Sequence, residues 1–151
     1  MDKFQWETIC GVVIEKDGKI LLVQEGKQSA KGLWNIPGGH LEPREDIFEA
    51  AIREVSEEAN IKIKLDNFLG VYYIPRETFT VTRLIFIGHI ISGEPKPQEG
   101  EILVVKWFTP DEGLALNEKL RGIKQALEDY KKGIRYPLDV VKRMRPWAGL
   151  K

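Results

Sequence analysis

Three glutamates close together in the sequence, Glu54, Glu57 and Glu58, constrain the fold of this chain more than any other feature. An α-helix turns through about 100° per residue, so a helix in this segment would present all three carboxylates on one face. Because like charges at neighbouring helix positions repel each other, a fold that keeps them together indicates a bound cation. The apolar residues of the segment occupy a neighbouring arc that can pack on a core: Phe48, Ala51, Ile52, Val55 and Ala59.

The residues that flank this segment predict where the helix begins and ends. Asp46, with Glu49 three residues later, is typical of a capped helix N-terminus. Asn60 is typical of a helix end in the left-handed conformation. Before the helix, residues 37–39 (Pro-Gly-Gly) predict a tight turn that allows a ligand to approach the backbone closely. A backbone carbonyl of that turn could face the same cation as the carboxylates.

Residues 39–61 (GHLEPREDIFEAAIREVSEEANI) resemble the signature box of the Nudix hydrolases. The matching positions are Gly39, Glu45, Arg53-Glu54-Val55, Glu57-Glu58 and Ile61. The sequence departs from the family at Asn60, where the family usually has glycine, and asparagine is the residue that next best tolerates that conformation. The resemblance implies a hydrolase with the helix–sheet–helix fold of the family.

The resemblance also implies roles for individual residues. Glu57 and Glu58 are the first candidates for metal ligands, and Glu54 is a third ligand that also helps to orient the attacking water. Arg53 is expected to pair with and orient a glutamate of the box, such as Glu54. Gly38 is a candidate to lend a carbonyl to the metal. The alternative for the whole cluster is a solvated acidic helix face.

The chemistry of the ligands predicts the metal and the kind of substrate. Clustered carboxylates are hard oxygen ligands, which suit Mg²⁺ or Mn²⁺ rather than zinc. His40, His89 and Cys10 are the only histidines and cysteine, which leaves little material for a nitrogen or sulfur site. Magnesium usually takes further ligands from substrate phosphates, so we expect a di- or triphosphate substrate. A metal-activated water would then attack phosphorus.

Four residues outside the box are further candidates for the site. Glu101 opens a predicted strand and is a candidate metal-binding or general-base carboxylate, with Glu99 as its rival and a surface position as the alternative for both. Arg83 could bind a phosphate as a forked donor or form a surface ion pair. Trp34 could stack on a base or ring of the substrate, although aromatic residues in strands are more often part of the core.

The resemblance extends weakly to one branch of the family. Residues 33–42 and 135–138 resemble the NudJ-type phosphatases, which implies hydrolysis of nucleoside di- or triphosphates or of related small pyrophosphates. An ADP-ribose or dinucleoside polyphosphate pyrophosphohydrolase is the nearest alternative. A non-catalytic ligand-binding sensor on the same fold is an alternative of another class, which the complete set of box carboxylates disfavours.

Length and composition limit the remaining possibilities. The chain has 151 residues, 42% of them hydrophobic, which predicts one domain over residues 1–151. Lys+Arg and Asp+Glu both number 23, and this balance disfavours stable binding to nucleic acid or membranes. The single cysteine and the lack of a signal pattern or a membrane-spanning stretch predict a cytoplasmic protein. Phe4 and Trp6 near the N-terminus could serve a homodimer interface.

The order of elements predicts an α+β fold, an α/β/α sandwich with a mixed sheet between helices. We expect strands over residues 8–15, 20–24, 33–36, 61–73, 79–91 and 102–108. Apart from the box helix, we expect a helical turn over residues 111–116 and a longer amphipathic helix over residues 117–132. The last residues, 144–151, are expected to be loose.

Overall fold

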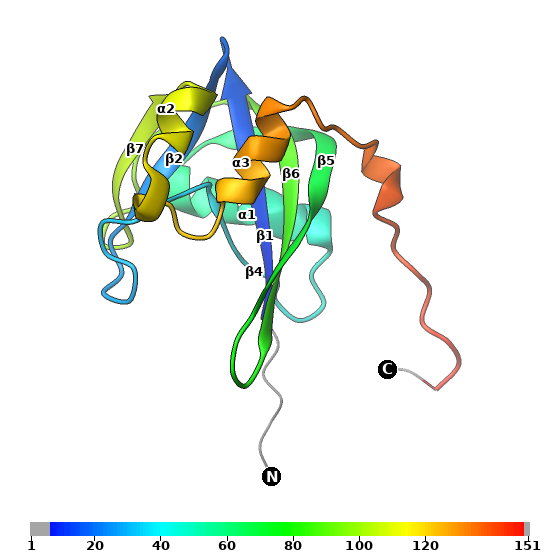
Figure 1. The fold of residues 1–151 in the computed structure, drawn as a ribbon. Coiled ribbons are helices and arrows are strands. Elements are labelled where there is room, and N and C mark those ends of the chain that lie inside the picture. The colour runs from blue at the N-terminus through cyan, green and yellow to red at the C-terminus, as the bar shows by residue number, and fades with distance from the viewer. Residues whose placement is uncertain (1–6, 150–151) are drawn as a thin grey trace.

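Strand β1 (Glu7–Lys16) lies at the centre of the sheet in the computed structural model, which describes residues 7–149 (Figure 1). It pairs in parallel with β6 (Thr80–Ser92), which in turn pairs antiparallel with β5 (Lys62–Pro75). On its other side β1 pairs antiparallel with β4 (Gly38–His40) and, at its end, with β2 (Lys19–Glu25). Strands β3 (Trp34–Asn35) and β7 (Ile102–Phe108) both pair antiparallel with β2. The predicted mixed sheet is confirmed.

Helices cover both faces of this sheet. Helix α1 (Ile47–Ala59) lies behind it in Figure 1, while α2 (Pro110–Leu114) and α3 (Lys124–Lys131) lie in front. The core is accordingly divided into two layers. Val55 and Phe86 belong to the layer beneath α1, whereas Ile85 and Leu127 belong to the layer beneath α3. This arrangement confirms the α/β/α sandwich.

The predicted limits of helix α1 are confirmed by its caps. The Asp46 side chain accepts a hydrogen bond from the Phe48 backbone N–H at 2.8 Å. Asn60 adopts the left-handed conformation with φ 57°, and its side-chain amide donates to the Lys96 carbonyl oxygen at 3.0 Å. The predicted apolar arc needs one correction, because Ala50 is fully buried while Ile52 is 36% exposed.

The longer helix predicted over residues 117–132 is wrong at its start. The chain forms a short 3₁₀ helix, η1 (Asn117–Lys119), and then α3 begins only at Lys124. Gly122 between them has φ 64°, a left-handed conformation that interrupts an α-helix. Two short elements were not predicted: strand β4, within the glycine turn, and the 3₁₀ helix η2 (Leu138–Val140).

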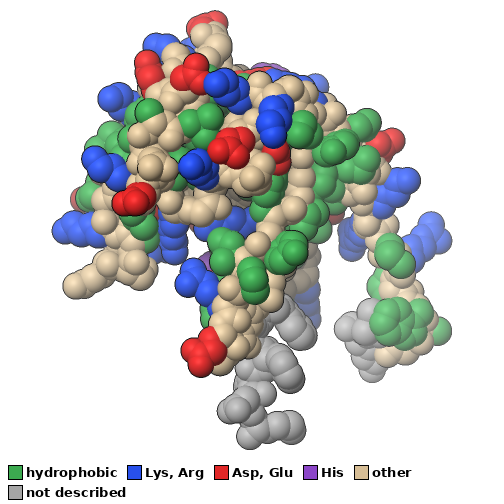
Figure 2. Space-filling model, in the orientation of Figure 1, with side chains coloured by type: hydrophobic (Ala, Val, Ile, Leu, Met, Phe, Trp, Pro, Cys, Tyr) green, Lys and Arg blue, Asp and Glu red, His purple; other side chains and the backbone are tan. Residues whose placement is uncertain are grey.

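Further sequence predictions concern Cys10, the N-terminal aromatic residues and membrane-spanning helices. Cys10 is fully buried in β1, as expected for a core residue. Phe4 and Trp6, the candidates for a dimer interface, lie outside the described residues. None of the helices over residues 7–149 has the length and apolarity needed to cross a membrane. The face shown in Figure 2 carries Lys and Arg side chains interspersed with Asp and Glu.

Candidate active site

The three glutamates of the box converge on one cavity of about 240 Å³, at the edge where α1 meets the ends of β2 and β7. Helical spacing places Glu54, Glu57 and Glu58 there, while β2 contributes Glu25 and β7 contributes Ile102. The complete lining is Glu25, Lys27, Glu42, Arg53, Glu54, Glu57, Glu58, Gln98, Glu101 and Ile102. We call this the acidic cavity.

Arg53 organises the acidic side chains around the cavity. Its Nε and Nη2 atoms donate to the two carboxylate oxygens of Glu45, at 2.5 and 3.0 Å. Its Nη1 atom donates to Glu54 Oε1 at 2.9 Å and to both carboxylate oxygens of Glu57 at 3.2 Å. The expected pairing with Glu54 is present, and the Arg53 guanidinium also fixes the loop before α1, because Glu45 accepts from the Glu42 backbone N–H at 3.1 Å.

Glu58 is the most strongly perturbed carboxylate of the cavity. Burial raises its pKa to about 8, and the negative charges of Glu25 and Glu54 act in the same direction. Its Oε1 atom accepts a hydrogen bond from the Gly38 backbone N–H at 3.4 Å, but its Oε2 atom is buried and has no hydrogen-bond partner within residues 7–149. Burial also raises the pKa of Glu54, against the opposing charge of Arg53. Carboxylates desolvated in this way favour a cationic partner.

The two glycines of the turn before helix α1, Gly38 and Gly39, let the backbone approach these carboxylates. A Cβ atom on Gly39 would lie 2.3 Å from the Glu54 carboxylate carbon. A Cβ atom on Gly38 would lie 2.6 Å from the Cys10 carbonyl oxygen in β1. Gly38 was predicted to offer a carbonyl to the metal, and the contact seen at this residue is the hydrogen bond from its N–H group to Glu58.

The structure separates the two rival carboxylates near β7. Glu101 lines the acidic cavity and forms an ion pair with Lys27, with 3.2 Å between Nζ and Oε2. Glu99 is exposed and is not among the residues that line the cavity.

Glu25 also lines the acidic cavity, although the sequence analysis did not predict it as a site residue. It is 7% exposed and accepts hydrogen bonds from Asn35 at 3.3 Å and from Arg121 at 3.2 Å.

The two predicted substrate-binding residues lie outside the acidic cavity. Arg83 is 7% exposed, so it is not a surface ion pair. Its Nη1 atom donates to the Arg121 carbonyl oxygen at 2.9 Å, and its Nε atom is buried with no hydrogen-bond partner in the described part of the chain. It lines a small cavity together with Asn35 and Gly38, next to the glycine turn. Trp34 is half-buried and contacts Phe108 edge-on, with ring centroids 5.1 Å apart.

The donor set fits a hard divalent cation. Among residues 7–149, no three His, Cys, Asp or Glu side chains are already gathered as a finished metal site. Arg53 Nη1 donates to oxygens of both Glu54 and Glu57, whereas one oxygen of Glu58 has no partner among the residues that the structure describes. Because that oxygen is buried and the negative charges of Glu25 and Glu54 act on the same carboxyl, it is the group most in need of a cation.

An α/β/α sandwich that carries this acidic helix behind a glycine turn defines a hydrolase of the Nudix class. The model of the NUDIX domain matches residues 5–130, so the chain belongs to the NUDIX domain family and is a Nudix hydrolase. Hydrolases of this family act on pyrophosphate linkages and generally use divalent metal ions.

Individual relatives agree with this assignment. The phosphatase NudJ of Escherichia coli K12 is 32% identical over 132 residues, which are 85% of this chain and 86% of that protein. A NUDIX hydrolase from Nitrosomonas europaea is 34% identical, with a TM-score of 0.83 over 93% of this chain and 98% of that one. A MutT NUDIX hydrolase from Burkholderia pseudomallei is 29% identical, with a TM-score of 0.74 over 83% and 98%.

Proposed function

We propose that this protein is a Mg²⁺-dependent hydrolase, with Mn²⁺ as a substitute, of the phosphoanhydride bond in nucleoside di- or triphosphates or related small pyrophosphates. The observation that carries the proposal is the Glu58 carboxylate, which has a buried oxygen with no partner among the described residues and lies beside Glu54 and Glu57 in one cavity. Three ionisable carboxylates in one cavity, with Glu54 and Glu58 shielded from water, are stabilised when a dication and an anionic phosphate are present together.

Glu54, Glu57 and Glu58 are the residues that would hold the metal, with the backbone of Gly38 beside them. When bound, a divalent ion supplies charge neutralisation for the phosphates and makes water a stronger nucleophile at neutral pH. The protein contributes positioning. Arg53 holds Glu54 and Glu57 through its Nη1 atom and is itself held by Glu45.

The proton of the attacking water needs an acceptor, and two carboxylates are placed to serve. Glu54 lies within the acidic cavity, and burial raises its pKa, which brings its proton affinity closer to that needed for a general base at neutral pH. Glu101 lines the same cavity, but its ion pair with Lys27 makes it less available to accept a proton from the water. We therefore propose Glu54 as the first candidate and Glu101 as the second.

The remainder of the substrate would extend toward Arg83 and Trp34. Arg83 is buried and forms no ion pair among the described residues, and a buried cation of this kind favours an anionic ligand. Gly38 lines the small cavity at Arg83 and also hydrogen-bonds to Glu58, so the two regions adjoin each other. The phosphatase NudJ, which is similar over most of the chain, supports a reaction that releases phosphate.

Product analysis separates this proposal from hydrolysis of ADP-ribose or dinucleoside polyphosphates. Purified protein with Mg²⁺ is incubated with nucleoside di- and triphosphates, ADP-ribose and diadenosine tetraphosphate, and all products are identified. Release of orthophosphate from a di- or triphosphate supports the proposal. Turnover of ADP-ribose to AMP and ribose 5-phosphate, or of the dinucleotide to two nucleotides, with no orthophosphate released and no turnover of di- or triphosphates, supports the alternative. Absence of turnover on the whole panel, together with saturable binding of one compound, favours a ligand-binding sensor.

Variants of helix α1 test the role of its carboxylates. Glu57→Gln and Glu58→Gln are expected to lower kcat by at least about 100-fold, because metal sites are this sensitive even to changes around their ligands. Glu49→Gln is the matched control, because Glu49 is exposed in the first turn of the same helix and does not line the acidic cavity. Equal activity of all three variants would contradict the proposed site.

A further inference from the structure

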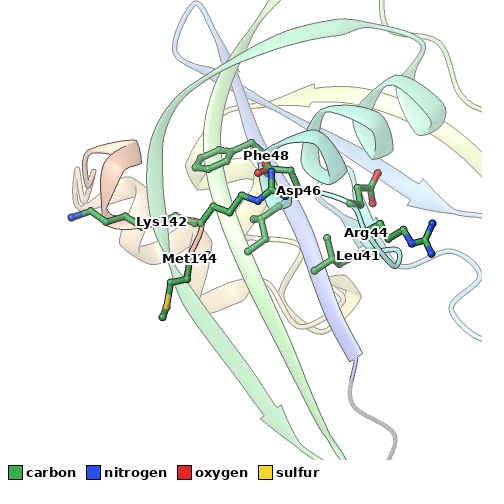
Figure 3. Close-up of a pocket in the computed structure, with 10 residues that line it drawn as sticks. Leu41, Arg44, Asp46, Phe48, Lys142 and Met144 are labelled. Carbon is green, nitrogen blue, oxygen red and sulfur yellow. The ribbon is translucent and has the colours of Figure 1, made fainter. Parts of the chain in front are cut away.

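A second and larger cavity, of about 460 Å³, lies between the start of α1 and the segment that follows η2. Its apolar lining consists of Leu41, Ile47, Phe48, Val141 and Met144. The first four of these also pack against the core layer beneath α1, so the floor of the cavity is held by the fold. Figure 3 shows Leu41 and Phe48 between Met144 on one side and Arg44 on the other.

The rim of this cavity carries positive charge that the described residues do not neutralise. Arg44, Lys142 and Arg143 line it, and none of the three forms an ion pair within residues 7–149. The two acids in the lining already have partners. The Asp46 carboxylate caps helix α1 through the Phe48 N–H, and the Glu45 carboxylate is held by Arg53. An apolar interior with a cationic rim therefore remains.

This cavity is separate from the acidic cavity. Residues 41–46 form the partition between them, since Glu42 lines the acidic cavity whereas Leu41 and Arg44 line the second one. The two cavities also carry opposite charge, because Glu25, Glu54 and Glu58 dominate the first. Without a bound cation, the acidic cavity therefore repels an anion that the second cavity attracts.

We propose that the second cavity binds a small amphipathic anion, a molecule with an apolar body and a phosphate or carboxylate head. The apolar body fits the space over Leu41, Phe48 and Val141, and the head pairs with Arg143, Lys142 or Arg44 at the rim. A cavity of about 460 Å³ lies within the usual range for small-molecule sites, roughly 300–1,000 Å³, so it has room for one small molecule.

Octyl phosphate is a suitable probe, used below its micelle concentration on the full chain without added metal. Calorimetric titration is expected to show saturable binding of octyl phosphate, while octyltrimethylammonium does not bind. In ¹H–¹⁵N spectra the perturbed amides are expected to be those of Leu41, Phe48 and Val141. The double substitution Lys142→Glu with Arg143→Glu is expected to weaken binding by at least about tenfold, because it reverses charge at the rim.

The control is Lys119→Glu with Lys132→Glu, which changes the net charge equally at exposed positions that do not line this cavity. Equal weakening by both double variants, or amide changes confined to the acidic cavity, would overturn the proposal. Binding to anionic vesicles without binding of monomeric octyl phosphate would also overturn it.

Discussion

Single residues set the electrostatics of the site, and Arg53 has the largest part in this. Its guanidinium donates to Glu45, Glu54 and Glu57, so one positive charge serves three carboxylates. These acceptors raise the pKa of Arg53 further above its already high value, with the hydrogen bonds to Glu45 as the main cause. Glu58 lies outside this network, and its buried oxygen is therefore the carboxylate oxygen that remains available to bind a cation.

The two adjacent glycines give a prediction at the same scale. Gly38→Ala is expected to lower the free energy of unfolding by about 1–3 kcal/mol, because its Cβ would press on the Cys10 carbonyl and the Gly11 backbone, which cannot move freely. Gly39→Ala is expected to leave stability closer to wild type and to lower kcat, because its Cβ would displace the Glu54 side chain.

Denaturant unfolding and steady-state kinetics on both variants check this distinction. Gly18→Ala is not a suitable control, because Gly18 has φ 75°, where any side chain is strained. Gly113→Ala is suitable, because its Cβ would meet neighbours only at ordinary contact distances of 3.6 Å or more. A larger loss of stability for Gly39→Ala than for Gly38→Ala would contradict the geometry described.

At the scale of elements, helix α1 places the site, and its end is a sensitive point. Asn60 adopts φ 57° and its side chain also bonds the Lys96 carbonyl oxygen. Asn60→Gly is expected to change stability little, because glycine accepts this conformation while the hydrogen bond is lost. Asn60→Ala is expected to cost about 1–2 kcal/mol, because it loses the same bond and also strains the backbone. Thermal unfolding measures the order of stability among wild type and the two variants. An alanine variant as stable as the glycine variant would contradict the prediction.

The elements also show what the sequence reveals and what it leaves out. Helical spacing predicted that Glu54, Glu57 and Glu58 share a face, because that relation is local. Glu25 escaped prediction because it ends a strand far away in the sequence, and only the pairing of β2 with β7 brings it beside Glu101. The start of α3 was misplaced because apolar spacing continues through Gly122, while the backbone there turns left-handed.

At the scale of the whole molecule, the C-terminal segment is tied back to the sheet. Tyr136 exchanges two backbone hydrogen bonds with Phe68 of β5, at 2.8 and 2.9 Å. Arg135 and the Tyr130 hydroxyl both donate to the Glu15 carboxylate at the end of β1. This carboxylate therefore joins the first strand to the last part of the chain.

The Glu15 contact predicts a pH-dependent contribution to stability. Burial acts to raise the pKa of Glu15, but the hydrogen bonds from Arg135 and Tyr130 outweigh it and hold this pKa below its ordinary 4.5. Glu15 then stabilises the fold above pH 4.5, and the contribution disappears as the pH falls through the lowered pKa. Glu15→Gln is expected to destabilise by up to about 1 kcal/mol at pH 7, because the pair is partly exposed to solvent.

Urea unfolding of wild type and Glu15→Gln between pH 7 and pH 3 measures this effect. The difference between the two proteins is expected to shrink on acidification. Glu118→Gln serves as the control, since the Glu118 carboxylate is exposed and forms no ion pair among residues 7–149. A difference that grows toward acid would have the wrong sign for a lowered pKa.

The Cys10 thiol can report the unfolding events that expose the central strand β1. Burial raises the pKa of Cys10 to about 11, and its sulfur is shielded in the middle of β1. Since the thiolate is the reactive form, an alkylating reagent is expected to modify folded molecules very slowly and denaturant-unfolded ones rapidly. The rate at which iodoacetamide alkylates Cys10 in the native protein, followed by mass spectrometry, would then measure how often local unfolding exposes the central strand.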